Sequence, residues 1–225
     1  MDPLSPLLAP PDLAAEANHR IANSLALLGS LVRMQARLAG RSGKAYSGLE
    51  IRFLFDGIAA RIASIGQLHR MLSNIPPDGV VRLNGHLRDV ASALIAAYSS
   101  DHQPVRIEHR GMDCLVLTKY VQPLTLILCE ILTNAMKYAH PAGAAAEVHI
   151  ACEAREGGTL VVSIGDDGVG LPDGFDPSKD GGVGFQIIRA LCADMEAGLE
   201  ILSGNLGLTV RITIPAALVA NARRA

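Results

Sequence analysis

The periodicity of the apolar residues changes once along this chain, and that change limits the possible folds more than any other feature. Between residues 13 and 72 apolar side chains recur every three or four positions, as they do on one face of an α-helix. Two glycines in "AGRSGK" (39–44) interrupt this pattern, and "NIPPDG" (74–79) ends it. The sequence therefore predicts two domains, residues 1–76 and 80–225, of which the first is all-helical.

The first domain is expected to be a hairpin of two long antiparallel helices. Its second apolar run alternates steps of four and three in a heptad seam, formed by Ile51, Phe55, Ile58, Ile62, Ile65, His69 and Leu72. A single hairpin cannot bury an apolar stripe on each of its helices. Two chains are therefore predicted to form a four-helix bundle, in which the seam residue His69 is packed.

The second domain mixes short strands with helices. Strands are predicted at 105–110, 114–118, 146–154 and 159–165, and the chain closes with a hairpin over 199–215. Helices are predicted at about 83–97, 120–139 and 183–196. The fold class is thus α+β, with a helical hairpin followed by a two-layer α/β sandwich.

Composition and charge exclude several classes of protein. The net charge of −2 is spread along the chain without a basic run, so no nucleic-acid partner is expected. The four cysteines lie far apart in apolar runs, which predicts reduced core thiols and a cytoplasmic location. The longest apolar run, 121–136, is interrupted by Glu130 and Asn134 and is too short to cross a bilayer, so no membrane anchor is expected.

The segment "CEILTNAMKYAHP" (129–141) places three polar residues on one helix face. Glu130, Asn134 and Lys137 are spaced by four and three residues, opposite an apolar face. Carboxylate and amide oxygens suit Mg²⁺, and a lysine ammonium suits phosphate. The alternative interpretation is a solvated helix face with an incidental ion pair.

Two glycine-rich segments follow. In "GDDGVGLP" (165–172), Asp166 follows a strand, and Gly168 and Gly170 permit a tight turn close to a ligand. In "GGVGFQIIRAL" (181–191), Gly182 and Gly184 open a helix whose free N–H groups favour a phosphate. Their alternatives are an ordinary β-turn and a flexible loop with an N-cap.

The segment "EANHRIANSL" (16–25) places Glu16, His19 and Asn23 one turn apart on a helix. At about 100° per residue, His19 points away from the buried stripe. Its imidazole can act as a nucleophile if Glu16 accepts the second ring N–H, while Asn23 orients a water or a phosphoryl oxygen. The alternative is an exposed histidine on a polar helix face.

Over roughly residues 80–215, the order and intervals of the second-domain segments resemble the ATP-binding domain of the GHKL superfamily, which has a Bergerat-type fold. The resemblance implies that Asn134 is a Mg²⁺ ligand of the N box and that Asp166 binds adenine. Gly168 and Gly170 match the G1 box, and Gly182 and Gly184 match the G2 box. The segment "LPDGFDPSKDG" resembles a short ATP lid, Phe185 stands where leucine is commoner, and "GNLGLTV" matches the last motif poorly.

The first domain resembles the phosphoacceptor hairpin of sensor histidine kinases of the HRxxN type, relatives of the HWE group. His19 is the acceptor in this pattern, which Arg20 and Asn23 complete, whereas Asn18, Ala22 and Ser24 depart from it. The resemblance implies a homodimeric histidine kinase that uses ATP and Mg²⁺ and transfers the phosphoryl group from His19 to an aspartate of a response-regulator receiver domain. Glu130 would position a metal-bound water or assist proton removal, and a separate sensor protein can dock on the bundle.

Two alternatives remain. The chain can act as a histidine phosphotransferase or a response-regulator phosphatase with weak or no autokinase activity, given the residues at 18, 22 and 24. A third interpretation is an ATP-gated binding module that resembles anti-sigma-factor kinases. Those proteins lack a dimerising hairpin with an outward histidine, so the first 75 residues argue against it.

Overall fold

The structure, a computed structural model, describes residues 79–98, 105–140 and 144–215, together with single positions between 29 and 62. Of the latter, Val32, Ile51, Phe55 and Ile62 are helical, as the periodicity predicts. Most of the predicted hairpin lies outside the described residues. The four-helix bundle therefore stays a prediction.

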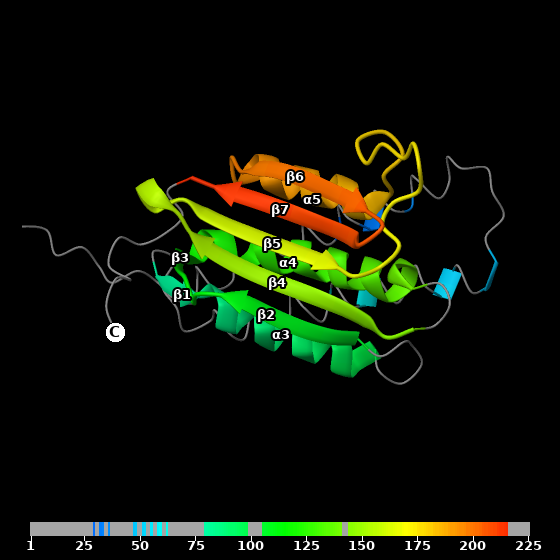
Figure 1. The fold of residues 1–225 in the computed structure, drawn as a ribbon, viewed down its shortest axis with the longest axis horizontal. Helices are drawn as coiled ribbons and strands as arrows, with labels where there is room; N and C mark the ends of the chain where they lie inside the picture. Colours follow the sequence, from blue (N-terminus) through cyan, green and yellow to red (C-terminus); the bar gives the residue numbers. More distant parts are fainter. Residues whose placement is uncertain are drawn as a thin grey trace, which may run out of the picture.

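The described part of the second domain is a sheet with helices on one face (Figure 1). Five strands follow the order β2-β4-β5-β7-β6, with bounds Val105–Gly111, Ala146–Ala154, Leu160–Asp166, Gly207–Ile214 and Gly198–Gly204. The helices that cover them are α3 (Leu83–Tyr98), α4 (Thr118–Asn134) and α5 (Val183–Asp194). The predicted mixed α/β fold with two layers is thereby confirmed for these residues.

Register within the sheet follows the alternation of the strand sequences. Along β4, Ala146, Val148, Ile150 and Cys152 are buried beneath the helices, while the residues between them face the other side. The predicted β4–β5 hairpin turns through the short 3-10 segment η2 (Glu156–Gly158), where Gly157 and Gly158 have positive φ. Its antiparallel register pairs Ala154 with Leu160. The glycine pair thus supplies the left-handed backbone that this turn requires.

Two pairings were not predicted. Strand β2 pairs with β4 in parallel, and a three-residue strand β1 (Val80–Arg82) forms a separate ribbon with β3 (Leu115–Leu117). Both pairings join segments more than thirty residues apart, counted from their registers. Local periodicity contains no information about such pairings.

The helix that carries the N-box segment changes its pitch. Helix α4 ends at Asn134 and continues as a π-helical turn, η1 (Ala135–Ala139), whereas the sequence predicts one uniform helix to residue 139. A π turn has wider i→i+5 hydrogen bonding and fewer degrees of rotation per residue than an α-helix. Lys137 is therefore rotated relative to Asn134 from the position that an α-helical wheel gives.

All four cysteines are buried and form no disulfide, as expected of reduced core thiols. Burial raises the pKa of the Cys152 thiol to about 12 and that of Cys192 to about 11, so both stay protonated and inert near neutral pH. Among the described helices, none has the length and apolar character needed to cross a bilayer.

Candidate active site

The N-box face of α4 is partly buried. Glu130 is only 3% exposed, and Asn134 one turn later is half-buried. The interpretation of this face as fully solvated is therefore wrong at Glu130. A carboxylate placed so deep calls for a specific environment, because an isolated buried charge is costly.

The start of α5 supplies part of that environment. A Cβ atom on Gly184 would lie 3.1 Å from Glu130 Oε2 and 3.5 Å from Asn134 Nδ2, so the glycine backbone packs directly against both side chains. Gly182, at the N-cap of α5, has open space where a side chain would stand, and no side chain caps the helix there. The structure thus brings the predicted N-box and G2 residues together around an uncapped helix N-terminus.

Asp166 stands at the end of β5 and is 5% exposed. Its Oδ1 accepts hydrogen bonds from the backbone N–H groups of Gly168, at 2.9 Å, and Leu208, at 3.4 Å. These contacts fix the carboxylate and leave Oδ2 as the oxygen available to another donor. The second backbone donor comes from the segment whose motif match is poor, so the sequence did not identify it.

Gly168 joins this loop to the end of the N-box helix. Its Cβ would lie 2.4 Å from Ala139 Cα, and the next residue donates its backbone N–H to the Ala139 carbonyl at 2.9 Å. Gly207 on the facing hairpin has a φ of 111°, and a Cβ there would lie 1.8 Å from the Asp166 carbonyl oxygen. Gly207 was not predicted as a site residue, although a glycine before the last strand is a signal of this kind of close approach.

His140 and Asp167 add a side-chain link between the same two segments. His140 Nε2 lies 2.8 Å from Asp167 Oδ1, which also accepts the Glu147 backbone N–H at 2.8 Å. Partial burial raises the pKa of the Asp167 carboxyl, but the hydrogen bonds from Glu147 and His140 outweigh it and hold the pKa below its usual value. His140, which follows the N-box helix, therefore contacts the G1 loop.

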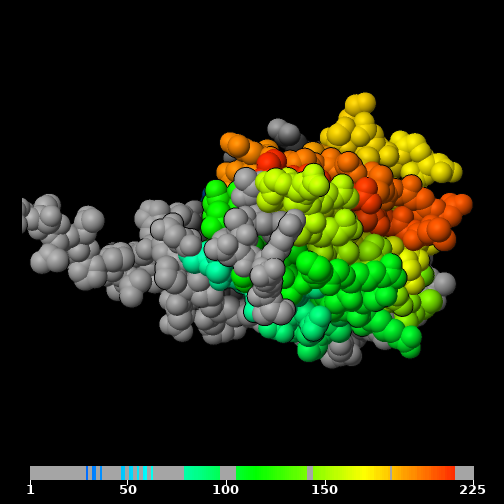
Figure 2. Space-filling view, turned by 60° about the vertical axis from the view of Figure 1, so that its left-hand side comes forward, coloured from blue at the N-terminus to red at the C-terminus, as the bar shows by residue number. Residues whose placement is uncertain are grey.

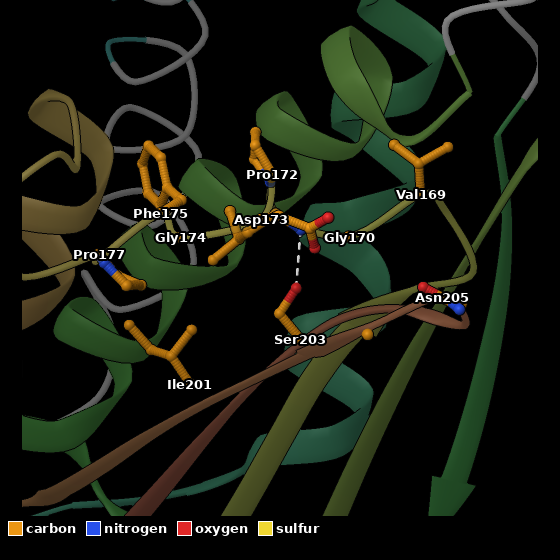
Figure 3. Close-up of a pocket in the computed structure, with 12 residues that line it drawn as sticks. Val169, Gly170, Pro172, Asp173, Gly174, Phe175, Pro177, Ile201, Ser203 and Asn205 are labelled. Atoms are coloured by element: carbon orange, nitrogen blue, oxygen red, sulfur yellow. Dashed lines mark hydrogen bonds between the residues drawn. The ribbon is translucent and has the colours of Figure 1, made fainter.

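The segment between Gly170 and Gly182 forms a loop that projects from the domain (Figure 2). Hydrogen bonds within it close a turn, in which Asp176 accepts the N–H and hydroxyl of Ser178 and its carbonyl accepts the N–H of Asp180. A cavity of about 670 Å³ separates this lid from β6, and Ile201 and Ser203 on that strand point towards the lid (Figure 3). Of the predicted site residues, the cavity is lined only by Gly170.

Three predicted residues cannot be placed. Glu16, His19 and Asn23 lie outside the described residues, so their geometry stays a prediction.

Lys137 is half-buried in the π turn. Within the part of the chain that the structure describes, no group of three or more His, Cys, Asp or Glu side chains converges as a metal cluster. The oxygens of Glu130 and Asn134 nevertheless fit Mg²⁺, which binds few protein ligands and completes its shell with water and phosphate.

Comparison with protein families agrees with this geometry. Residues 120–218 match the family described as histidine kinase-, DNA gyrase B-, and HSP90-like ATPase, and residues 16–98 match a family described as histidine kinase. The chain belongs to the histidine kinases. The match over residues 16–98 includes the segment around His19, and it continues through α3, beyond the predicted domain boundary.

Similar proteins include light-activated and sensor kinases. The chain is 28% identical over 205 residues to blue-light-activated histidine kinase 2 of Erythrobacter litoralis, covering 89% of this chain and 56% of that protein. It is 31% identical over 194 residues to sensor histidine kinase PdtaS of Mycobacterium tuberculosis, covering 86% of this chain and 36% of the relative. The chain thus spans about half, or less, of the length of these relatives.

A solved structure shows the same fold. The histidine kinase domain of the Erythrobacter litoralis EL346 blue-light activated histidine kinase superposes with a TM-score of 0.66 at 24% identity, covering 92% of this chain and 95% of the other.

Proposed function

We propose that this chain is an ATP-dependent protein-histidine kinase of a two-component system, acting in the cytoplasm. The observation that carries the proposal is the position of two glycine segments on the end of one helix. Gly168 packs on Ala139, and Gly184 packs on Glu130 and Asn134. The segment that carries Asp166 and the N-terminus of α5 are thereby both attached to α4 and η1, where we expect them to bind the adenine and the phosphates of one nucleotide.

Each part of the site has a chemical role in this proposal. Asp166 accepts the exocyclic amine of adenine through Oδ2, because Oδ1 already accepts two backbone N–H groups. The first N–H groups of α5 and the Lys137 ammonium stabilise the phosphates. Asn134 and Glu130 would hold Mg²⁺, which offsets phosphate charge when bound.

The reaction itself takes place at His19. An unprotonated imidazole nitrogen attacks the γ-phosphorus of ATP, the bond from that phosphorus to the β–γ bridging oxygen breaks, and ADP leaves. Glu16 accepts the other ring N–H and so holds the reactive tautomer, while Asn23 orients a phosphoryl oxygen. The phosphoryl group then passes from His19 to an aspartate of a receiver domain.

Homodimer formation is part of the proposal. The heptad residues Ile51, Phe55 and Ile62 are 43%, 67% and 52% exposed in the single chain. An apolar seam exposed to this degree is stabilised by packing against the same seam of a second chain, which gives the four-helix bundle. A sensor protein that controls the kinase would dock on this bundle.

Incubation with γ-labelled ATP and Mg²⁺ tests the proposal. We expect acid-labile label on the wild type and on His69→Ala, and no label on His19→Ala or Asp166→Asn. Unlabelled wild type, or equal label on His19→Ala, contradicts the autokinase. If the unlabelled wild type instead accepts phosphoryl groups from a phosphorylated receiver on His19, the phosphotransferase or phosphatase alternative is supported.

A further inference from the structure

The lid is attached to the rest of the domain at two separate places. On its outgoing limb, which follows Gly170, the Leu171 backbone N–H donates to Ser203 Oγ of β6 at 2.7 Å. On its return limb, which leads from Phe175 to the start of α5, Arg189 of α5 donates from Nη1 to the Pro177 carbonyl. The rings of Phe175 in this limb and Phe185 in α5 lie 6.2 Å apart. The unusual Phe185 therefore contacts the lid. Both of these contacts to the return limb come from α5.

The Pro177 carbonyl is the central group of the return limb. It accepts the Arg189 hydrogen bond, and a Cβ on Gly181 would lie only 2.3 Å from the same oxygen. Gly181 immediately precedes the N-cap of α5. Holding the Pro177 carbonyl thus also holds the backbone that enters the helix.

The arginine is suited to this task by its position and its chemistry. Arg189 is half-buried near the middle of α5, and in the described part of the chain it forms no ion pair with a carboxylate. Its guanidinium is a charged donor, and a hydrogen bond from a charged donor to a carbonyl is stronger than one from a neutral donor. The contact stabilises the backbone conformation of the return limb whatever conformation the turn around Asp176 adopts.

The contact between Arg189 and Pro177 affects only one end of the nucleotide site. The start of α5 packs on Glu130 and Asn134, where the proposed function places phosphate and Mg²⁺, whereas the adenine end is fixed by contacts of Asp166 and Gly168 that do not involve the lid. We propose that Arg189 is a positioning residue, which holds the return limb of the lid so that the N-terminus of α5 is aligned for the phosphates. This inference rests on the proposed function.

Nucleotide binding to the full chain tests it, with adenosine, ADP and a non-hydrolysable ATP analogue as probes in the presence of Mg²⁺. For Arg189→Met we expect the Kd of the ATP analogue to rise about tenfold, as the loss of one charge-assisted hydrogen bond predicts, while the Kd of adenosine changes less than twofold. Arg189→Lys retains a charged donor, so it should recover most of the affinity. Arg155→Met, an exposed arginine of the β4–β5 hairpin, is the matched control and should bind all three probes as the wild type does.

Gly181→Ala provides a second variant that leaves the arginine in place. Its added Cβ pushes against the Pro177 carbonyl, so it should cause the same selective loss of the ATP analogue. Equal weakening of adenosine and the analogue in these variants, or no weakening at all, overturns the inference. A wild type that binds none of the probes contradicts the proposed function instead, so the two failures are distinguishable.

Discussion

The proposed adenine end of the site and the lid are built by different means. At the adenine end, backbone packs on backbone, as Gly168 does on Ala139 and Gly207 on Asp166. In the lid, polar side chains close an exposed turn, and a Cβ on Gly174 would meet nothing within 4 Å. Backbone contacts cannot adjust to an added atom, whereas an exposed turn can. The comparison indicates that the proposed adenine end is rigid, whereas the lid can reorganise when nucleotide binds.

Alanine substitutions at one glycine of each region should give the largest contrast. Gly168→Ala places Cβ within 2.5 Å of the Ala139 backbone, and we expect it to cost about 3 kcal/mol of unfolding free energy and to abolish ADP binding. Gly174→Ala, at a φ of 75°, adds only conformational strain of about 1 kcal/mol. Urea unfolding and ADP titration measure both effects. Similar losses in the two variants would contradict the comparison.

Acidification should next distinguish the domain core, to which α3 and β2 belong, from the lid. Thr125 Oγ1 donates to the Val121 carbonyl, so the buried His86 must donate its Nε2–H to Thr125, and among the described residues its Nδ1 has no partner. Burial lowers the pKa of His86, against a smaller opposing effect of Asp89, and burial together with Arg88 lowers the pKa of His109.

The unfolded chain therefore binds more protons, and stability is lost as the pH falls below about 6.5, by up to about 1.4 kcal/mol per pH unit for His86 and by less for the more exposed His109. The lid turn should not respond, because hydrogen bonds from Ser178 hold the pKa of Asp176 at about 2. Urea unfolding midpoints at pH 7, 6 and 5 measure this loss of stability. In His86→Gln the midpoint should depend less steeply on pH. The same pH dependence of the midpoint in this variant would exclude His86 as the cause of the loss.

A smaller effect is expected from the side-chain link at the adenine end. His140→Ala or Asp167→Asn should raise the Kd of ADP about twofold to threefold, because half-exposed pairs contribute less than about 1 kcal/mol. The double variant should be no worse than either single variant if the pair acts as one unit. Additive losses in isothermal titration would show that the two residues act independently.

The smallest effect belongs to Asp176. Its carboxylate closes an exposed turn with Ser178 and Lys179. Asp176→Ala should leave the urea midpoint and adenosine binding unchanged and should increase only the rate of proteolytic cleavage within residues 172–180. A lowered midpoint would mean that the lid contributes to the domain core, and the contrast between the regions would then fail.

Elements with local signals were predictable from the sequence. The alternation of "AEVHIACEA" predicted β4 with its observed bounds, and the paired glycines predicted the turn that follows. The structure brings the two glycine segments to the N-box segment, since Gly168 packs on η1 and Gly184 on α4, while their binding roles stay predictions. The hydrogen bonds from Leu208 to Asp166 and from Arg189 to Pro177 were not predicted, because a backbone donor and a contact to a carbonyl have no residue signature. The role of His19 stays a prediction.

The π turn after Asn134 has a consequence for how this site can vary. A turn of this kind contains one residue more than an α-helical turn of the same span, so the relation between Lys137 and the residues before it depends on the number of residues as well as on their identity. Deleting a single residue from 135–139 would restore an ordinary helix and swing the lysine around the axis, with every functional side chain still present. Relatives that differ in length at this point would thus differ in phosphate geometry despite identical motifs.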